Sequence, residues 1–180
     1  MSIEMRGTTI CAVKRNGVTA IAGDGQVTMG ESIVFKNNAQ KVRRIFNDSV
    51  ILGFAGSVSD AFTLCERFEG MLNKFSGNLL RSAVELAEEW RNDKAGRKLD
   101  AMMITADKNT LVIISGSGDV IEPDDGVCAI GSGGNYALAA ARALTEETDY
   151  SAEEIATKAL KIASKICIFT NDNIRCETVK

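Results

Sequence analysis

Alternating apolar positions near the start of the chain predict β-strands. Residues 8–13 and 18–22 alternate and are rich in β-branched side chains, and the Asn16-Gly17 step between them favours a tight turn. We therefore expect a β-hairpin, followed by a glycine-rich loop that runs through Gly30. Further short apolar runs predict strands at 33–35, 42–46 and 50–55.

Helical spacing of apolar residues follows in two consecutive segments. Ser57 and Asp60 resemble a capping box for the first helix, and Asn78 could cap the second. The apolar face expected for the first helix is Val58, Phe62, Cys65, Phe68, Leu72 and Phe75. The face expected for the second is Leu79, Ala83, Leu86, Ala87 and Trp90.

The second half repeats this order of strands before helices. Strands are expected at 102–106, 111–115, 120–121 and 127–130, and an alanine-rich helix at 136–145. Ser151 and Glu154 form a capping box for a last helix, and 174–179 is expected to be the final strand. The apolar face of that helix is Ala152, Ile155, Ala159, Ile162, Ala163 and Ile166.

Two groups of strands thus alternate with two pairs of helices. Single strands do not alternate with single helices, which argues against a doubly wound parallel sheet. The order favours two packed antiparallel sheets with helices outside. The 180 residues suit one domain, and no linker or repeat divides them.

Composition and charge exclude several classes of protein. A net charge of −3 without a long basic run gives no indication of nucleic-acid binding. The amino terminus lacks the apolar core of a signal peptide, and no 18-residue apolar run predicts a membrane span. Five widely spaced cysteines without a CxxC pair favour a reducing compartment, so we expect a cytoplasmic protein.

The complete absence of histidine restricts the possible catalysis. It excludes Ser-His-Asp and Cys-His mechanisms and any metal site that needs imidazole. Cleavage between Gly7 and Thr8 would supply another base, because the freed α-amine of Thr8 could take the proton of the Thr8 hydroxyl. An unperturbed α-amine has a pKa of about 7.7–8.0. The alternative is that Thr8 is an ordinary β-branched strand residue.

Two charged residues could control such an amine. Asp24 lies in the AGDGQ segment at the end of a strand, and Lys41 begins the KVRRIF segment. A buried Lys41 paired with Asp24 would disfavour the ammonium form of a nearby amine and lower its pKa. The alternatives are a turn carboxylate at Asp24 and a solvated strand-edge lysine at Lys41.

Two glycine-containing turns could complete the site. The N–H of Gly56, between a strand and a helix, could stabilise an oxyanion, although glycine also suits a tight turn there. The AIGSGGN segment at 129–135 lacks the lysine of a P-loop and the GxGxxG spacing, which disfavours nucleotide binding. Ser132 in this segment could instead hydrogen-bond the amine.

Cys167 is expected on the apolar face of the last helix, as a core thiol. Free carbonyl groups gather where a helix ends, and those of the SKICIFTND segment could bind a hard cation.

Several long segments together resemble the HslV (ClpQ) family of proteasome-like peptidases. The resemblance runs in order from Thr8 nearly to the carboxyl terminus. Its segments are TTI from Thr8, AGDGQVTMG from Ala22, KVRR from Lys41, GFAGSVSDAFTL from Gly53, AVELAEEWRNDK from Ala83, AIGSGGNYALAAARAL from Ala129 and ICIFTND from Ile166.

The resemblance implies an α+β fold, a four-layer αββα sandwich of the N-terminal-nucleophile hydrolase type. It implies a peptidase domain at 8–180 in which Thr8 is the nucleophile and its amine the base. Lys41 and Asp24 would set the electrostatics, Ser132 would orient the amine, and Gly56 would supply the oxyanion N–H. Residues 1–7 would be a leader removed by proteolysis, through autocatalytic cleavage.

The resemblance also implies an ion and partners. A sodium ion would bind backbone oxygens of Ser164, Cys167 and Thr170, and no organic cofactor is expected. Many members of the family have glycine where Ser164 stands, a change that a carbonyl ligand tolerates. The expected assembly is a cytoplasmic homododecamer of two stacked hexameric rings. It would act on unfolded proteins with the AAA+ ATPase HslU (ClpY), without nucleic acid or membrane.

Two alternatives remain. Removal of Met1 alone would expose Ser2 as a different N-terminal nucleophile within the same fold. An uncleaved leader would leave a non-catalytic ring or binding subunit.

Overall fold

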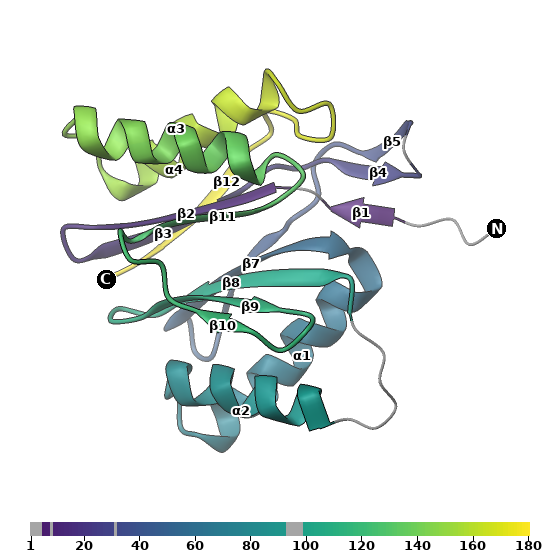
Figure 1. Cartoon of the computed structure of the whole chain (residues 1–180), viewed down its shortest axis with the longest axis vertical. Coiled ribbons are helices and arrows are strands. Elements are labelled where there is room, and N and C mark those ends of the chain that lie inside the picture. The colour runs from purple at the N-terminus through teal and green to yellow at the C-terminus, as the bar shows by residue number, and fades with distance from the viewer. Residues whose placement is uncertain (1–4, 8, 31, 93–98) are drawn as a thin grey trace.

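In the computed structural model, two antiparallel sheets face one another and helices cover their outer faces (Figure 1). The structure describes residues 5–7, 9–30, 32–92 and 99–180. Apolar side chains from both sheets, including Ile10 and Ile21 from one and Ile51 and Ile104 from the other, form a fully buried core between them. The αββα arrangement implied by the resemblance is confirmed.

The smaller sheet carries the chain start that the sequence predicts. Its strand order is β11-β2-β3-β12, formed by β2 (Thr9–Arg15), β3 (Val18–Gly23), β11 (Val127–Gly131) and β12 (Arg175–Val179). Asn16 and Gly17 both have positive φ, at 52° and 75°, as a two-residue hairpin turn requires. Helices α3 (Gly134–Glu147) and α4 (Ala152–Ser164) pack on its outer face, largely through alanines.

The larger sheet has eight strands in the order β10-β9-β8-β7-β1-β4-β5, with β6 also paired to β7. Its strands are β1 (Met5–Gly7), β4 (Val27–Met29), β5 (Ile33–Lys36), β6 (Val42–Ile45), β7 (Val50–Ser57), β8 (Ala101–Ala106), β9 (Leu111–Ser115) and β10 (Val120–Ile121). Helices α1 (Val58–Lys74) and α2 (Leu79–Asn92) cover its outer face around Phe68, Leu72 and Leu86.

Two short strands were not expected from the sequence. β4 lies within the segment predicted to be a glycine-rich loop, and β1 lies within the predicted leader. β1 pairs antiparallel with β7 on one side and with β4 on the other, so that Gly7 lies opposite both Gly56 and Val27. The end of the predicted leader is therefore an internal strand of the larger sheet.

The predicted caps had different outcomes. The capping box of Ser151 and Glu154 is confirmed, and Asn78 accepts a hydrogen bond from the backbone N–H of Arg81 at 3.0 Å. The box at Ser57 and Asp60 is wrong, because Ser57 makes no side-chain capping bond. The Asp60 carboxylate instead accepts from the backbone N–H of Asp100 at 3.0 Å, which ties α1 to the start of β8.

The apolar faces of two helices are rotated from those predicted. In α1, Ala61, Leu64 and Met71 are buried, whereas Phe62 is 40% exposed. α4 ends at Ser164, so Cys167 is buried beyond the helix and not on its face. Ile162 and Ile166, both predicted to face the core, are 40% and 56% exposed.

The cysteines contribute to packing. All five are free thiols, and burial raises the pKa of Cys65, Cys128 and Cys176 to about 12, so these thiols are poor nucleophiles near neutral pH.

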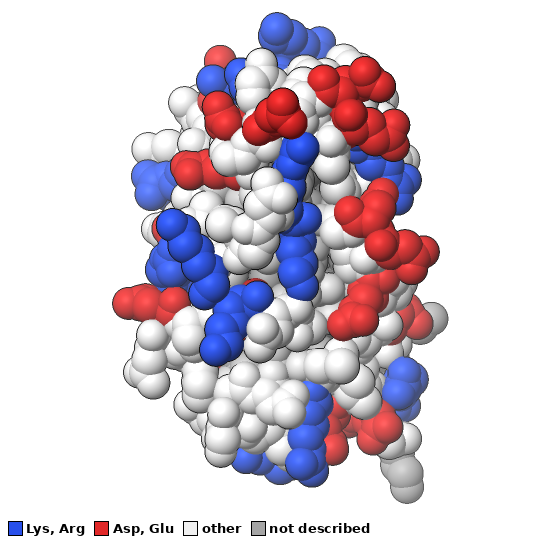
Figure 2. Space-filling model, turned by 90° about the vertical axis from the view of Figure 1, so that its left-hand side faces the viewer, with Lys and Arg blue, Asp and Glu red and all other residues white. Residues whose placement is uncertain are grey.

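Among the described helices, none is long and apolar enough to cross a membrane. On the face shown in Figure 2, basic side chains run down the middle and acidic side chains gather mainly along the right-hand side.

Candidate active site

Asp24 and Lys41 form a buried ion pair between the two sheets. Asp24 follows β3, Lys41 precedes β6, and the Lys41 Nζ lies 2.6 Å from Asp24 Oδ1. Asp24 is 1% exposed and Lys41 is 2% exposed. The predicted pairing is confirmed, and the surface-lysine interpretation of Lys41 is wrong, whereas Asp24 is also the turn carboxylate that the alternative described.

Backbone donors complete the coordination of the Asp24 carboxylate. Oδ1 also accepts from the N–H of Thr9 at 3.1 Å, and Oδ2 accepts from Gln26 and Asn171 at 3.0 and 3.2 Å. A buried charge is tolerated when it is paired and hydrogen-bonded in this way. Asp24 thereby joins the start of β2, the β3–β4 turn and the segment after α4.

The environment of Lys41 has opposing effects on its pKa. Burial lowers the pKa of Lys41 below its ordinary value, and the charge and hydrogen bond of Asp24 partly reverse that effect. The net direction is downward. Any role that needs the Lys41 ammonium is therefore lost, as pH rises, at a lower pH than for a free lysine.

We predict that Asp24→Asn moves the alkaline limb of the activity profile to lower pH. The substitution removes the carboxylate that raises the Lys41 pKa, so Lys41 loses its proton earlier as pH increases. The measurement is peptide turnover between pH 6 and 10. An alkaline limb at the wild-type position would show that Lys41 ionisation does not control activity.

Thr8, the predicted nucleophile, lies outside the described residues, whereas Gly7 and Thr9 on either side of it in the sequence are described. Gly7 ends β1, and Thr9 begins β2 with its N–H on Asp24. The predicted scissile bond therefore follows a strand of the larger sheet and precedes a strand of the smaller one. Thr9, the residue that follows Thr8 in the sequence, binds the carboxylate that pairs with Lys41.

Gly56 lies directly beside the predicted scissile carbonyl. It faces Gly7 in the β1–β7 register and has a φ of 113°. A Cβ at this position would lie 2.3 Å from the carbonyl oxygen of Asp100, so a side chain cannot be accommodated. The structure thus places Gly56 opposite Gly7, whose carbonyl is the one that an oxyanion donor must reach. Gly56 belongs to the end of β7 and not to the start of a helix.

Ser132 lies in the turn after β11. β11 pairs with one side of β2, and β3, which Asp24 follows, pairs with the other side. Gly131 pairs with Thr9 in the β11–β2 ladder, and the N–H of Gly133 donates to the Thr9 hydroxyl at 3.0 Å. Ser132 lies between these two contacts and is exposed. All four described members of the predicted catalytic set therefore lie around residues 7–9.

The predicted cation ligands form a separate group after α4. The carbonyl of Ser164 belongs to the last turn, where helix carbonyls lack intrahelical donors, and the Cys167 carbonyl accepts from the Thr170 N–H at 3.1 Å. Backbone oxygens suit a hard cation, so the donor type fits sodium. Within the described part of the chain, no group of three or more His, Cys, Asp or Glu side chains could hold a metal ion.

Sequence reasoning missed several polar residues that organise the site. Thr9 is fully buried, and its hydroxyl lies 2.7 Å from that of Thr170. The side-chain oxygen of Asn171 accepts from the Gly25 N–H at 3.0 Å. The only signal for them in the sequence is the polar TND segment at 170–172, which follows the apolar residues after the last helix.

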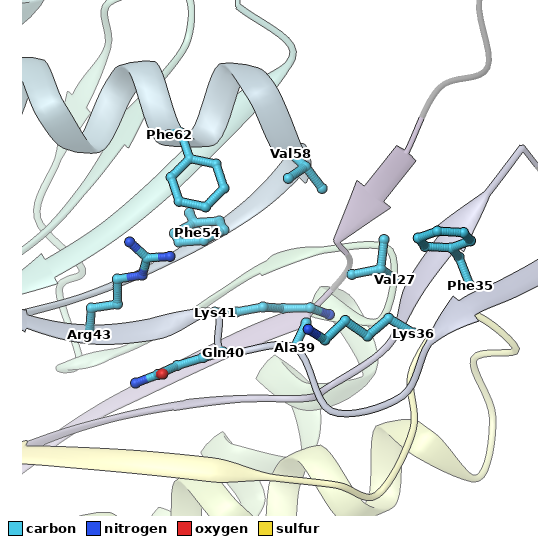
Figure 3. A pocket seen from close by; sticks show the side chains of 10 residues that line it. All are labelled: Val27, Phe35, Lys36, Ala39, Gln40, Lys41, Arg43, Phe54, Val58 and Phe62. Carbon is cyan, nitrogen blue, oxygen red and sulfur yellow. The ribbon is translucent and has the colours of Figure 1, made fainter.

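A pocket of about 330 Å³ opens beside Lys41. Side chains from β4, β5, β6, β7 and α1 line it, including Val27, Phe35 and Val58 (Figure 3). The Arg43 guanidinium lies 4.7 Å from the ring centroid of Phe62 and 5.8 Å from that of Phe54. The pocket is mainly apolar and can accept a side chain next to the predicted scissile bond.

Comparison with known proteins gives one consistent answer. Residues 4–179 match the family model described as proteasome subunit. A protein of Listeria innocua named ATP-dependent protease subunit HslV is 61% identical over 177 residues, covering 97% of this chain and 99% of that protein. A Staphylococcus carnosus protein of the same name is 58% identical, with 98% and 99% covered.

Solved structures agree with this result. The crystal structure of eukaryotic HslV from Trypanosoma brucei has a TM-score of 0.90 and 47% identity, covering 96% of this chain and 99% of that one. The structure titled Thiobacillus denitrificans BPH in complex with epoxomicin has a TM-score of 0.72 at 19% identity, which indicates a shared fold. The family model over residues 4–179 and the relatives of about 60% identity show that this chain belongs to the proteasome family.

Proposed function

We propose that this chain is the threonine-type proteolytic subunit of an ATP-dependent protease, with Thr8 as its N-terminal nucleophile. One observation carries the proposal. Lys41 and Asp24 form a buried pair at 2.6 Å, and the same Asp24 oxygen binds the N–H of Thr9. A fixed positive charge thus lies beside the residue that follows Thr8.

The chemistry follows from these positions. Once the Gly7–Thr8 bond is cut, the Thr8 amine takes the proton of the Thr8 hydroxyl as the oxygen attacks a peptide carbonyl. The Lys41 charge disfavours protonation of the amine and keeps it available as a base. The N–H of Gly56 stabilises the oxyanion, and Ser132 orients the amine. The amine then protonates the leaving nitrogen, and water hydrolyses the ester formed on Thr8.

The leader strand indicates how a substrate lies in the site. β1 fills the position between β7 and β4, and it ends at the predicted scissile bond. A substrate that pairs with the same two strands brings its own carbonyl beside Gly56, as Gly7 is now. The apolar pocket beside Lys41 then accepts a side chain of the substrate.

The relatives' name supports an ATPase partner. Proteins about 60% identical are named ATP-dependent protease subunits, yet no segment of this sequence has the P-loop pattern. We therefore propose that HslU (ClpY) supplies the ATPase and that the chain forms two stacked hexameric rings in the cytoplasm. The five free thiols are consistent with a reducing compartment. Sodium bound by carbonyl groups of Ser164, Cys167 and Thr170 would stabilise the segment that contacts Asp24 and Thr9.

Intact mass spectrometry tests the nucleophile directly. A mass that corresponds to residues 8–180 is expected, because the leader must leave before the Thr8 amine exists. A chain that begins at Ser2 would favour that residue as the nucleophile, and a full-length chain would indicate a non-catalytic subunit. Either result, in a preparation that hydrolyses peptides, contradicts the assignment of Thr8.

The same preparation tests the dependence on an ATPase. We expect a ring by sizing chromatography, slow cleavage of short peptides, and degradation of folded proteins only with HslU and ATP. Unfolding a domain costs about 5–15 kcal/mol, which a chain without a nucleotide site cannot supply. A monomer that degrades folded proteins unaided would contradict both the ring and the ATPase requirement.

A further inference from the structure

The hydroxyl of Thr9 lies at a buried junction of three segments. It is 2.7 Å from the hydroxyl of Thr170, across 161 positions of sequence, and accepts from the N–H of Gly133 at 3.0 Å. Thr9 is 0% exposed and Thr170 is 4% exposed. A buried hydroxyl with two partners of this kind is held in one orientation.

The backbone of Thr9 is fixed as well. Its N–H donates to Asp24, and its carbonyl accepts from the Asp24 N–H at 3.3 Å. The next residue after Thr170, Asn171, donates its own N–H to the other Asp24 oxygen. Residues 170 and 171 therefore contact the side chain of residue 9 and the carboxylate that pairs with Lys41.

The packing at this junction leaves no free space. A Cβ on Gly133 would lie 2.6 Å from the Thr170 hydroxyl oxygen and 2.7 Å from that of Thr9. Only a residue without a side chain lets the N–H of position 133 approach the two hydroxyls. The hydroxyl pair therefore packs against Gly133, in the turn that also carries Ser132.

We propose that Thr9 and Thr170 are positioning residues for the cleavage reaction. Their hydroxyl pair holds the start of β2, and thereby sets where the adjoining Thr8 amine and hydroxyl lie relative to Lys41 and Gly56. The proposal rests on Thr8 as the nucleophile. Catalysis depends steeply on such placement, since a displacement of about 1 Å can reduce a rate on the order of 10²-fold.

The test uses Thr9→Val and Thr170→Val in the full chain, because valine keeps the shape and removes the hydroxyl. We expect turnover per processed chain to fall about 10- to 100-fold with KM nearly unchanged. Intact mass gives the fraction of chains that begin at Thr8 and the rate of leader removal. We expect leader removal to slow by the same factor as peptide turnover. Thr9→Ser, which retains the hydroxyl, should recover most of the turnover.

Thr105→Val is the matched control. Thr105 is also fully buried in a strand, and its hydroxyl donates to the Ile51 carbonyl at 3.1 Å, within the other sheet. Thr105→Val should lower the melting temperature as much as the two test variants do, while its turnover stays at the wild-type level. The double variant Thr9→Val/Thr170→Val should be no slower than the worse single variant, because the two hydroxyls act as one unit.

Wild-type turnover per folded chain in both valine variants would overturn the proposal. If those variants also lose stability, the hydroxyl pair has a structural role only. If the wild-type chain itself begins at Thr8 and hydrolyses no peptide, the proposed function fails instead.

Discussion

Thr8→Ala is expected to abolish peptide hydrolysis and to leave residues 1–7 attached. Removing an enzyme nucleophile costs on the order of 10⁴–10⁶ in turnover. The chain has no histidine that could activate a different hydroxyl. Turnover of a short fluorogenic peptide and the intact mass of the purified chain measure the two effects together.

Two companion variants sharpen this result. Thr8→Ser keeps both the hydroxyl and the amine, so it should process its leader and retain part of the activity. Ser2→Ala should behave as wild type, because residue 2 is discarded with the leader. Near-normal peptide hydrolysis by Thr8→Ala would contradict the assignment of Thr8 as the nucleophile. Loss of peptide hydrolysis in Ser2→Ala would contradict it as well.

Lys41→Ala is expected to lower turnover by about 10²–10⁴-fold, the usual contribution of a positioned acid or base. Without the Lys41 charge the Thr8 amine is protonated more readily and no longer serves as a base near neutral pH. The variant also leaves Asp24 buried without a counter-ion, which costs about 3 kcal/mol of folding stability. Denaturant unfolding and sizing chromatography separate this loss from the effect on rate.

Arg142→Ala is a suitable control for the ion pair itself. Arg142 and Asp125 are also 2.6 Å apart, but their side chains are 52% and 42% exposed. Exposed pairs contribute about 0–1 kcal/mol, so both rate and stability should be almost unchanged. Equal rates in Lys41→Ala and Arg142→Ala would show that the buried pair serves stability alone.

Most elements of the fold could be predicted because their signals are local. The hairpin at Asn16-Gly17 depends on two adjacent residues, and the capping box at Ser151 on a spacing of three. The order of strands and helices was then enough to favour two sheets with external helices. The strand at 111–115 was predicted with its observed boundaries.

The errors arise where distant residues decide the structure. β1 and β4 have three residues each, and neither forms without the partner strands that flank it. Ser57 and Asp60 have the spacing of a cap, but Asp100, 40 positions away, binds the carboxylate instead. No local pattern records such a partner.

The site shows the same division. The residue types and the motifs identified Asp24 and Lys41, and the structure confirms their pairing. The role of residue 9 depends on Thr170 and Gly133, which lie 161 and 124 positions away. The segment around Thr170 predicted a cation site, and the segment around Gly133 predicted that Ser132 binds the amine. Neither segment indicates a hydroxyl pair.

Under the proposed removal of residues 1–7, the strand at Met5–Gly7 has a kinetic consequence for when activity begins. While it is covalently attached, the leader competes for its own site at an effective concentration on the order of millimolar, which a dilute peptide cannot match. Cutting the Gly7–Thr8 bond ends that advantage, and the released segment diffuses away. Reversal would require the peptide bond to re-form, so the proposed cleavage would change each chain from latent to active once, without return.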